Sequence, residues 1–267
     1  MEYKGLAIDL DGTLLVGEDL SAENRDAVRA AKQAGFEVII ATARWRHMAQ
    51  RISAEIGLDG PIIACSGAEV YLPGDGVDIF DHRLPDGFTQ ELYELCNQNR
   101  CIATITTEDE VWLKLDGEPN PALLSAEMRW VPQLDHVAQG QPRIAAIQGT
   151  ALVNEIKQNL LPKWQDSINL YDSIGPSGKL VITITAKAAN KGEALRNACL
   201  HTGIDPAHFI SFGDAENDIE MFKITGASVA MGQAEDFIKQ AATHTTLNNT
   251  EHGVAAAIHK LLDTGRL

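Results

Sequence analysis

The sequence predicts an α/β protein in which a parallel sheet is interrupted by an inserted α+β domain. Two observations carry this prediction. Short apolar runs alternate with amphipathic stretches through residues 1–81, and the same alternation returns after residue 185. Between these segments, apolar runs and helical stretches no longer follow one another strictly. We therefore expect a discontinuous core domain of residues 1–81 and 186–267, and an inserted domain of residues 82–185.

The N-terminal segment contains three predicted strands and two predicted helices. Buried strands are expected at residues 5–10, 36–41 and 61–65. Helices are expected at residues 22–34 and 46–56. Ser21 suits the N-cap of the first helix, and Gly35 suits its end. Residues 69–80 contain two apolar runs around Pro-Gly-Asp-Gly, which is typical of a hairpin.

The order of the predicted elements differs between the inserted domain and the segment that follows it. In the inserted domain, strands are expected at residues 101–106, 111–115, 143–148 and 180–185. After it, helices are expected at residues 191–201, 217–224 and 254–262, and strands at 209–212 and 227–230. The strand-then-helix order favours a parallel sheet built from both flanking segments.

The composition is that of an ordinary globular protein. The chain has 267 residues, of which 45% are hydrophobic and 22% charged, so it is long enough to bury a core without metal or disulfide staples. Its formal net charge of -15 argues against a nucleic-acid partner, because phosphate backbones are bound by basic surfaces. No apolar run approaches the roughly 18 residues of a membrane span. We expect neither nucleic-acid nor membrane partners.

The start of the chain and its cysteines favour a cytoplasmic location. The first residues lack the basic region and long apolar core of a signal peptide. Four cysteines form no Cys-x-x-Cys pair and no zinc spacing, which favours reduced thiols. Cys96 and Cys101 are the only close pair.

Polar residues follow three of the predicted strands at the point where each strand ends. Asp9 and Asp11 end the first strand, Thr42 follows the second, and Asp214 follows the strand at 209–212. Ligands of open parallel sheets bind beyond the carboxyl ends of the strands. The sequence therefore predicts that these four side chains share one edge of the sheet.

Helix caps, turns and calcium loops are also rich in aspartate. A single aspartate in a loop is more often a turn or helix-cap residue, but convergence from three strands favours a site. An Asp-x-Asp-Gly segment is also found in calcium loops. Counting from Asp9, however, puts Gly12 at the fourth position and Leu20 at the twelfth, where a calcium loop needs glycine sixth and glutamate twelfth.

Carboxylates in this arrangement suit a hard divalent cation, and magnesium is the expected one. We expect Asp9 and Asp214 to supply side-chain ligands. Because the chain is strongly acidic, the metal would provide the local positive charge that a phosphate ester needs.

Four segments also resemble those of a known family. They are Asp9-Leu10-Asp11-Gly12-Thr13 followed by Leu14, then Thr42, Lys191 and Gly213-Asp214-Ala215-Glu216-Asn217-Asp218. This set resembles the four motifs of the haloacid dehalogenase (HAD) superfamily. The inserted domain resembles the cap of its Cof-type (type IIB) sugar-phosphate phosphatases. The resemblance covers essentially the whole chain and implies a Rossmann-like parallel-sheet core with an inserted α+β cap.

The resemblance implies a magnesium-dependent enzyme with an aspartyl-phosphate intermediate. Asp9 corresponds to the nucleophile. Asp11 corresponds to the acid and base, and its backbone carbonyl also contacts the metal. Asp214 completes the metal ligands. Lys191 corresponds to the cation that binds both the nucleophile and the phosphoryl group.

The remaining site residues are implied to bind substrate or to support the site. Expected contacts with substrate come from Thr42, Ala43, Arg44, Lys191 and Asn217, and Asp218 is expected just behind the metal ligands. Three positions depart from the family pattern: Ala43 replaces a usual glycine, Ser66 a usual asparagine, and Ala215 a frequent serine or threonine. None of these departures removes a group that performs covalent or proton chemistry.

Three functions are compatible with these motifs. The leading one is hydrolysis of a small phosphorylated metabolite, such as a sugar phosphate. A phosphomutase or phosphotransferase would use the same aspartyl phosphate, and a non-catalytic phospho-ligand sensor would keep only the fold. The inserted domain offers Trp112, Lys114, Trp130 and Arg143 as substrate contacts, but such residues are more often core. The sequence identifies neither the phosphate ester nor the oligomeric state.

Overall fold

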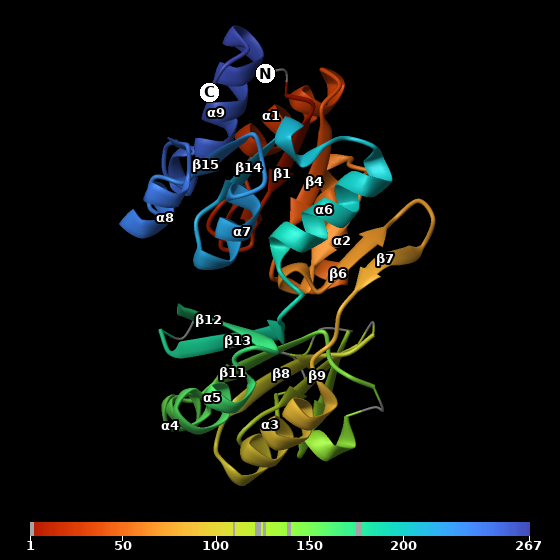
Figure 1. The fold of residues 1–267 in the computed structure, drawn as a ribbon, viewed down its shortest axis with the longest axis vertical. Coiled ribbons are helices and arrows are strands. Elements are labelled where there is room, and N and C mark those ends of the chain that lie inside the picture. Colours follow the sequence, from red (N-terminus) through yellow and green to blue (C-terminus); the bar gives the residue numbers. More distant parts are fainter. Residues whose placement is uncertain (1–2, 109, 121–123, 125–126, 138–139, 175–177) are drawn as a thin grey trace. The chain divides into compact units, whose positions relative to one another are not determined.

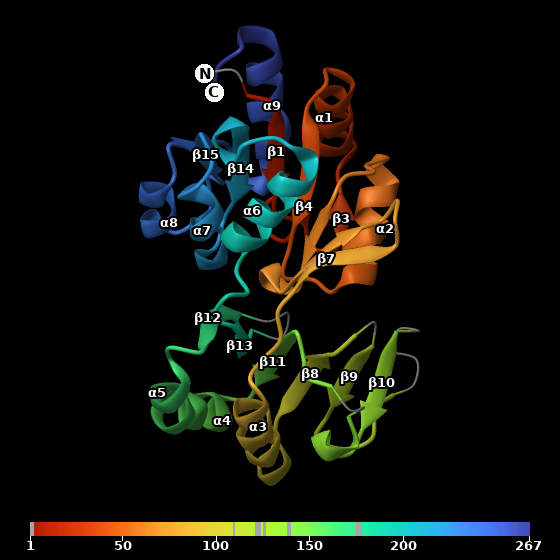
Figure 2. The same cartoon turned by 45° about the vertical axis from the view of Figure 1, so that its right-hand side comes forward.

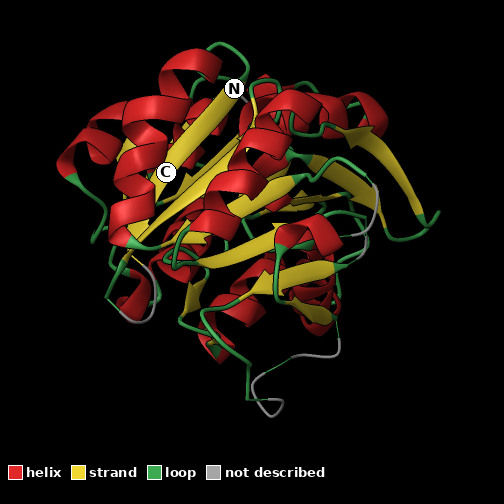
Figure 3. Ribbon diagram, turned by 90° about the horizontal axis from the view of Figure 1, so that it is seen from below, coloured by secondary structure: helices red, strands yellow, loops and turns green. Residues whose placement is uncertain are grey.

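The structure is a computed structural model that describes residues 3–108, 110–120, 124, 127–137, 140–174 and 178–267 (Figure 1). The chain divides into two compact units. Unit 1 comprises Met1–Phe80 and Asn190–Leu267, and unit 2 comprises Asp81–Ala189. The insertion expected at residues 82–185 is slightly shorter than unit 2 at both ends. Both units combine helices and strands, coloured red and yellow in Figure 3.

Unit 1 contains an eight-stranded sheet in the order β16-β15-β14-β1-β4-β5-β6-β7. Neighbouring strands from β16 to β5 are parallel, whereas β5 and β6 are antiparallel. The strands are β1 (Gly5–Ile8), β4 (Glu37–Ala41), β5 (Ile62–Ala64), β6 (Glu69–Leu72), β7 (Val77–Asp81), β14 (Phe209–Gly213), β15 (Ala227–Ala230) and β16 (His244–Thr245). The predicted α/β class with a parallel-sheet core is confirmed.

Helices cover both faces of this sheet because its central strands are apolar on both faces. Leu6 and Ile8 pack into one hydrophobic cluster with residues of α1, α2 and α9. Ala7 and Ile39 point the other way and pack with residues of α6 and α7. The helices are α1 (Ala22–Gln33), α2 (Arg46–Ile56), α6 (Lys191–Thr202), α7 (Ile219–Phe222), α8 (Asp236–Ala241) and α9 (Gly253–Thr264).

Near the candidate residues, unit 1 differs from the predictions in two places. A short hairpin of β2 (Leu15–Val16) and β3 (Asp19–Leu20) follows β1 and was not expected. The helix expected at residues 217–224 is a 3₁₀ turn, Glu216–Asp218, followed by the single-turn α7. This turn is held by backbone bonds from Asp214 and Ala215 to the Asp218 side chain.

Unit 2 contains a six-stranded sheet in the order β10-β9-β8-β11-β13-β12. Its pairs are antiparallel except for β9 and β10. The strands are β8 (Ile102–Thr106), β9 (Val111–Lys114), β10 (Met128–Val131), β11 (Ile144–Gln148), β12 (Ile168–Ile174) and β13 (Leu180–Ala186), and the helices are α3 (Asp86–Gln98), α4 (Thr150–Glu155) and α5 (Leu161–Trp164). The helices lie along one face of this sheet and enclose a separate core (Figure 2).

Two charged side chains of unit 2 are buried. Arg143 is 1% exposed and forms an ion pair with Asp81, and Lys114 is 5% exposed. Both are therefore part of the interior of unit 2. Among the described helices, none combines the length and the apolar character needed to cross a membrane.

Candidate active site

Three adjacent strands bring the candidate residues to one edge of the unit 1 sheet. β1 lies between β14 and β4, and Ile8 pairs with both Phe212 and Ile40. Asp9, Thr42 and Asp214 follow these strands within two residues of the paired positions. The register therefore delivers them to the carboxyl end of the sheet, as the sequence predicts.

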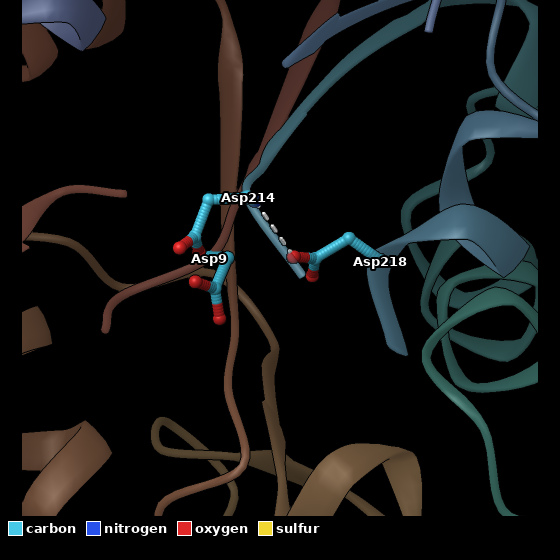
Figure 4. A group of neighbouring side chains, drawn as sticks. All are labelled: Asp9, Asp214 and Asp218. Atoms are coloured by element: carbon cyan, nitrogen blue, oxygen red, sulfur yellow. Dashed lines mark hydrogen bonds between the residues drawn. The ribbon is translucent and has the colours of Figure 1, made fainter. Parts of the chain in front are cut away.

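Three carboxylates converge at this edge. Asp9, Asp214 and Asp218 each present an oxygen, and these oxygens all lie within 4.8 Å of one another. Figure 4 shows Asp9 and Asp214 side by side, with Asp218 approaching from the opposite side. The Thr13 hydroxyl donates a hydrogen bond of 3.1 Å to Asp214. This group contains both expected side-chain ligands, Asp9 and Asp214, and adds Asp218.

Lys191 is the cation of this cluster. Its side chain is only 1% exposed, and its Nζ lies 2.6 Å from both Asp9 Oδ1 and Asp218 Oδ1. Lys191 is the first residue of α6, a position set by Asn190, whose side chain caps the helix by accepting from the Glu193 N–H. The lysine is therefore held in place by both its helix and its two carboxylate partners.

Asp218 supports the cluster from behind. While one of its oxygens accepts from Lys191, the other accepts from the backbone N–H groups of Asp214 and Ala215 at 3.0 Å each. Gly213 makes this possible, because a Cβ at that position would overlap the Asp218 side chain. Asp218 thus contacts both the lysine and the loop that carries Asp214.

The charges of this site favour an added cation. Burial raises the pKa of Asp9 well above its ordinary value, and Lys191 only partly opposes this. Burial, followed by the charge of Asp218, raises the pKa of Asp214 to about 6. Burial lowers the pKa of Lys191, but the charges of Asp218 and Asp9 outweigh it and keep the amine protonated. One amine faces three carboxylates, and all the ligand atoms are oxygens, so the donor set suits a divalent cation such as magnesium.

The Asp11 side chain lies outside the carboxylate cluster. It is half exposed and accepts from Arg44, with Nη2 at 2.6 Å from Oδ1 and Nε at 2.9 Å from Oδ2. Arg44 also pairs with Glu18 at 2.7 Å. Arg44 was expected to contact substrate, but here its donors are directed to two carboxylates. The β2–β3 turn, which the sequence did not reveal, brings Glu18 to this position.

Thr42 and Ser66 belong to two loops that are joined by a backbone hydrogen bond. Thr42 is fully buried, and its hydroxyl accepts from the Arg44 N–H at 3.1 Å while its carbonyl accepts from the Ser66 N–H at 3.0 Å. Ser66 has a left-handed backbone with φ of 57°, and its buried hydroxyl has no hydrogen-bond partner within the part of the chain described. Strained backbone of this kind is concentrated at functional sites.

Other expected residues have weaker links to the cluster. Ala43 is exposed, and Asn217 is half-buried in the turn before α7. Gln233 was not predicted as part of the site, but its side-chain amide donates to the Gly12 carbonyl and so braces the loop after β1. No pattern pointed to this residue, because its partner is 221 residues away.

Comparison with known proteins identifies the family. The model of the haloacid dehalogenase-like hydrolases matches residues 6–258. The chain belongs to this family. The resemblance drawn from its motifs is therefore confirmed, and the match extends through both units.

Individual members of this hydrolase family align with the whole chain. A 5-amino-6-(5-phospho-D-ribitylamino)uracil phosphatase of Bacillus subtilis (strain 168) is 29% identical over 97% of this chain and 98% of its own length. A phosphoglycolate phosphatase of Methanobrevibacter smithii is 26% identical over 98% of this chain and 100% of its own. A solved HAD subclass IIB sugar phosphatase superposes with a TM-score of 0.81 at 22% identity, covering 97% and 98% of the two chains, and so shares the fold.

Proposed function

We propose that this hydrolase is a magnesium-dependent phosphatase that removes phosphate from a small phosphorylated metabolite through an aspartyl phosphate on Asp9. The observation that carries the proposal is the buried group of Asp9, Asp214, Asp218 and Lys191 at the carboxyl end of the sheet. A nucleophilic carboxylate, a fixed cation and a place for a divalent metal are together what phosphoryl transfer requires.

The proposed reaction has two displacements at phosphorus. An Asp9 oxygen attacks the phosphate ester, a P–O bond to Asp9 forms, and the bond to the leaving oxygen breaks. Water then hydrolyses the aspartyl phosphate and regenerates Asp9. Lys191 already contacts Asp9 at 2.6 Å, so it is placed to bind the phosphoryl oxygens and stabilise their charge during both steps. Thr42, with the backbone of Ala43, is the further proposed contact for a phosphoryl oxygen.

A divalent cation bound by Asp9 and Asp214, with the Asp11 carbonyl as the further proposed ligand, would reduce repulsion between the carboxylates and the anionic phosphate. The pKa values of Asp9 and Asp214, which burial raises, support this assignment because a cation stabilises both groups in the ionised form. Asp218 is bonded to Lys191 and to the backbone, and so serves to position these groups.

Asp11 is the proposed acid and base. It would protonate the leaving oxygen and then accept a proton from the attacking water. In the structure its carboxylate forms an ion pair with Arg44 at 2.6 Å. For the acid step we therefore infer that Asp11 exchanges this partner for the substrate, and that Arg44 and Asn217 become available to polar groups of the ligand.

The substrate class proposed here is a small phosphate monoester such as a sugar phosphate. The two sequence relatives described above are named for a ribityl phosphate and for phosphoglycolate, which share the phosphate ester and a small polar body. The net charge of -15 supports a small-molecule substrate rather than a nucleic acid. Four free cysteines support a reducing compartment such as the cytoplasm.

A panel of phosphate monoesters with magnesium tests this proposal. Wild-type protein should release inorganic phosphate from at least one ester, and Asp9→Asn should lower the rate by roughly 10⁴-fold or more because the nucleophile is lost. Asp26→Asn, an exposed change on α1, serves as the matched control and should retain full activity. Equal rates for wild type and Asp9→Asn would contradict the mechanism. Recovery of an isomerised ester instead of phosphate would indicate a mutase.

A further inference from the structure

Two thiols and one amine form a buried cluster in unit 2, which contributes no residue to the carboxylate cluster of unit 1. Cys96 lies in the last turn of α3, Cys101 immediately precedes β8, and Lys114 ends β9. They are 0%, 4% and 5% exposed. The family motifs do not include this cluster, and the proposed phosphatase mechanism does not use it.

Lys114 has an unusual set of neighbours for a buried amine. Its Nζ lies 3.4 Å from the Asn99 carbonyl oxygen and 3.7 Å from Cys101 Sγ. No carboxylate of a described residue forms an ion pair with it. A buried ammonium without a counter-ion is costly, typically by several kcal/mol. The Cys101 sulfur is the neighbour that can supply the negative charge, as a thiolate.

The second thiol stabilises that charge. Cys101 packs against the last turn of α3, which carries Cys96, and its thiol donates to the Cys96 carbonyl oxygen at 3.6 Å. The Cys96 hydrogen bond, aided by the charge of Lys114, lowers the pKa of Cys101 to about 7 although burial and Asp116 oppose it. The same contact with Cys101, together with burial, raises the pKa of Cys96. One cysteine is therefore suited to attack and the other to remain a thiol.

A glycine lies beside Cys101. Gly149, which is only partly buried, lies against it, and a Cβ at that position would be 3.5 Å from the Cys101 Cβ. Because glycine has no side chain, only its backbone lies beside the Cys101 Cβ at this point. A small neutral oxidant such as hydrogen peroxide needs little more space than a water molecule to reach the sulfur.

We propose that Cys96 and Cys101, with Lys114 beside them, form a peroxide-sensitive thiol pair that closes to a disulfide. The Cys101 thiolate attacks one peroxide oxygen, so an S–O bond forms, the O–O bond breaks and hydroxide leaves. The Cys96 thiol then attacks the Cys101 sulfenic acid, forming the S–S bond and releasing water. In total, two thiols are oxidised and one peroxide is reduced to two waters.

The test is a time course of the full-length protein with hydrogen peroxide near pH 7. Samples are quenched, alkylated after unfolding, and analysed by peptide mass spectrometry. A peptide pair linked through Cys96 and Cys101 should appear first and should disappear with dithiothreitol. Cys199 in unit 1 is the internal reference, because it is 3% exposed and burial raises the pKa of its thiol to about 12. Oxidation of Cys101 no faster than Cys199 would overturn the proposal.

Matched variants identify the role of the amine. Lys114→Met should slow formation of the link by roughly threefold, because Lys114 contributes part of the lowering of the Cys101 pKa and the thiolate fraction near neutral pH falls. Lys163→Met, an exposed change in the same unit, should leave the rate unchanged. Cys96→Ser should leave Cys101 as a sulfenic acid that dimedone traps. A link that forms as fast in Lys114→Met as in wild type would refute the part assigned to the amine, and the comparison with Cys199 needs no variant.

Discussion

Gly67 marks the closest approach between the loop after β5 and the helix that carries Lys191. Its φ is +89°, and a Cβ there would lie 2.6 Å from the Lys191 backbone nitrogen and closer still to the Asn190 carbonyl carbon. Cys65 and Ser66 before it also have positive φ angles of 51° and 57°. Three successive residues are thus held in a conformation that L-residues rarely adopt, directly against the start of α6.

Gly67→Ala is expected to destabilise the protein by roughly 3 kcal/mol or more, because backbone strain and overpacking act together. It should also lower phosphatase activity, since α6 must shift and carries Lys191 with it. Gly35→Ala is the matched control: its φ is +94°, but nothing lies within 4 Å of the added Cβ. That variant should lose only about 1–2 kcal/mol and keep its activity. Denaturant unfolding and phosphate release measure both effects, and equal losses in the two variants would contradict this account.

At the scale of the element, the N-cap of α6 determines where the site residue Lys191 lies. Asn190 Oδ1 accepts from the Glu193 N–H at 2.9 Å and so fixes the first turn. Lys191 is the first helical residue of that turn. Helix α1 begins in the same way, with Ser21 accepting from the Asn24 N–H at 3.2 Å, but it carries no proposed site residue.

Asn190→Ala and Ser21→Ala should therefore separate stability from function. Each removes one N-cap and should cost about 1 kcal/mol of unfolding free energy. Asn190→Ala should also reduce kcat by roughly tenfold or more, because small displacements of a charge-stabilising group are costly in phosphoryl transfer. Ser21→Ala should leave kcat unchanged. Thermal unfolding and steady-state kinetics on both variants provide the measurement, and an unchanged kcat for Asn190→Ala would show that the cap does not position Lys191.

Some elements were readily predicted and others were not. The position of a strand within its sheet explains the difference. The helix at Arg46–Ile56 and the strand at Ala227–Ala230 agree with prediction at both ends. Among the described residues, five strands were not predicted: β2, β3, β10, β12 and β16. Each lies at an edge of its sheet. An edge strand is partly solvated and contains polar residues, so it lacks the apolar run by which buried strands are recognised.

For the molecule as a whole, charge connects the site to stability. The chain has a formal net charge of -15, and its candidate site adds three converging carboxylates next to one lysine. The pKa of Asp214 in the folded protein, about 6, is above its ordinary value of 3.8. The folded protein therefore binds this proton more tightly than the unfolded chain does. The stability that Asp214 contributes is fully present below about pH 3.8 and is lost as the pH rises through about 6.

Magnesium should compensate for that loss at neutral pH. At roughly a hundredfold excess over its Kd it should stabilise the protein by about 2.7 kcal/mol. The increase in Tm should be larger near pH 7.5 than near pH 5, because protons compete with the metal for the carboxylates. Asp214→Asn should abolish most of the increase at both values. Thermal unfolding with magnesium or with EDTA measures this, and an equal increase at the two pH values would argue against metal binding by Asp214.

The sequence alone determined the family, the parallel sheet and the edge at which Asp9, Thr42 and Asp214 lie. These depend on local patterns, because apolar runs define buried strands and the carboxyl ends of parallel strands share one edge. Only the tertiary structure decided that Asp218 joins Asp9 and Asp214 in the carboxylate cluster. Such contacts join side chains far apart in the chain, and no periodicity records them. The same holds for the amine of Lys114 beside Cys101, which only the folding of unit 2 brings together.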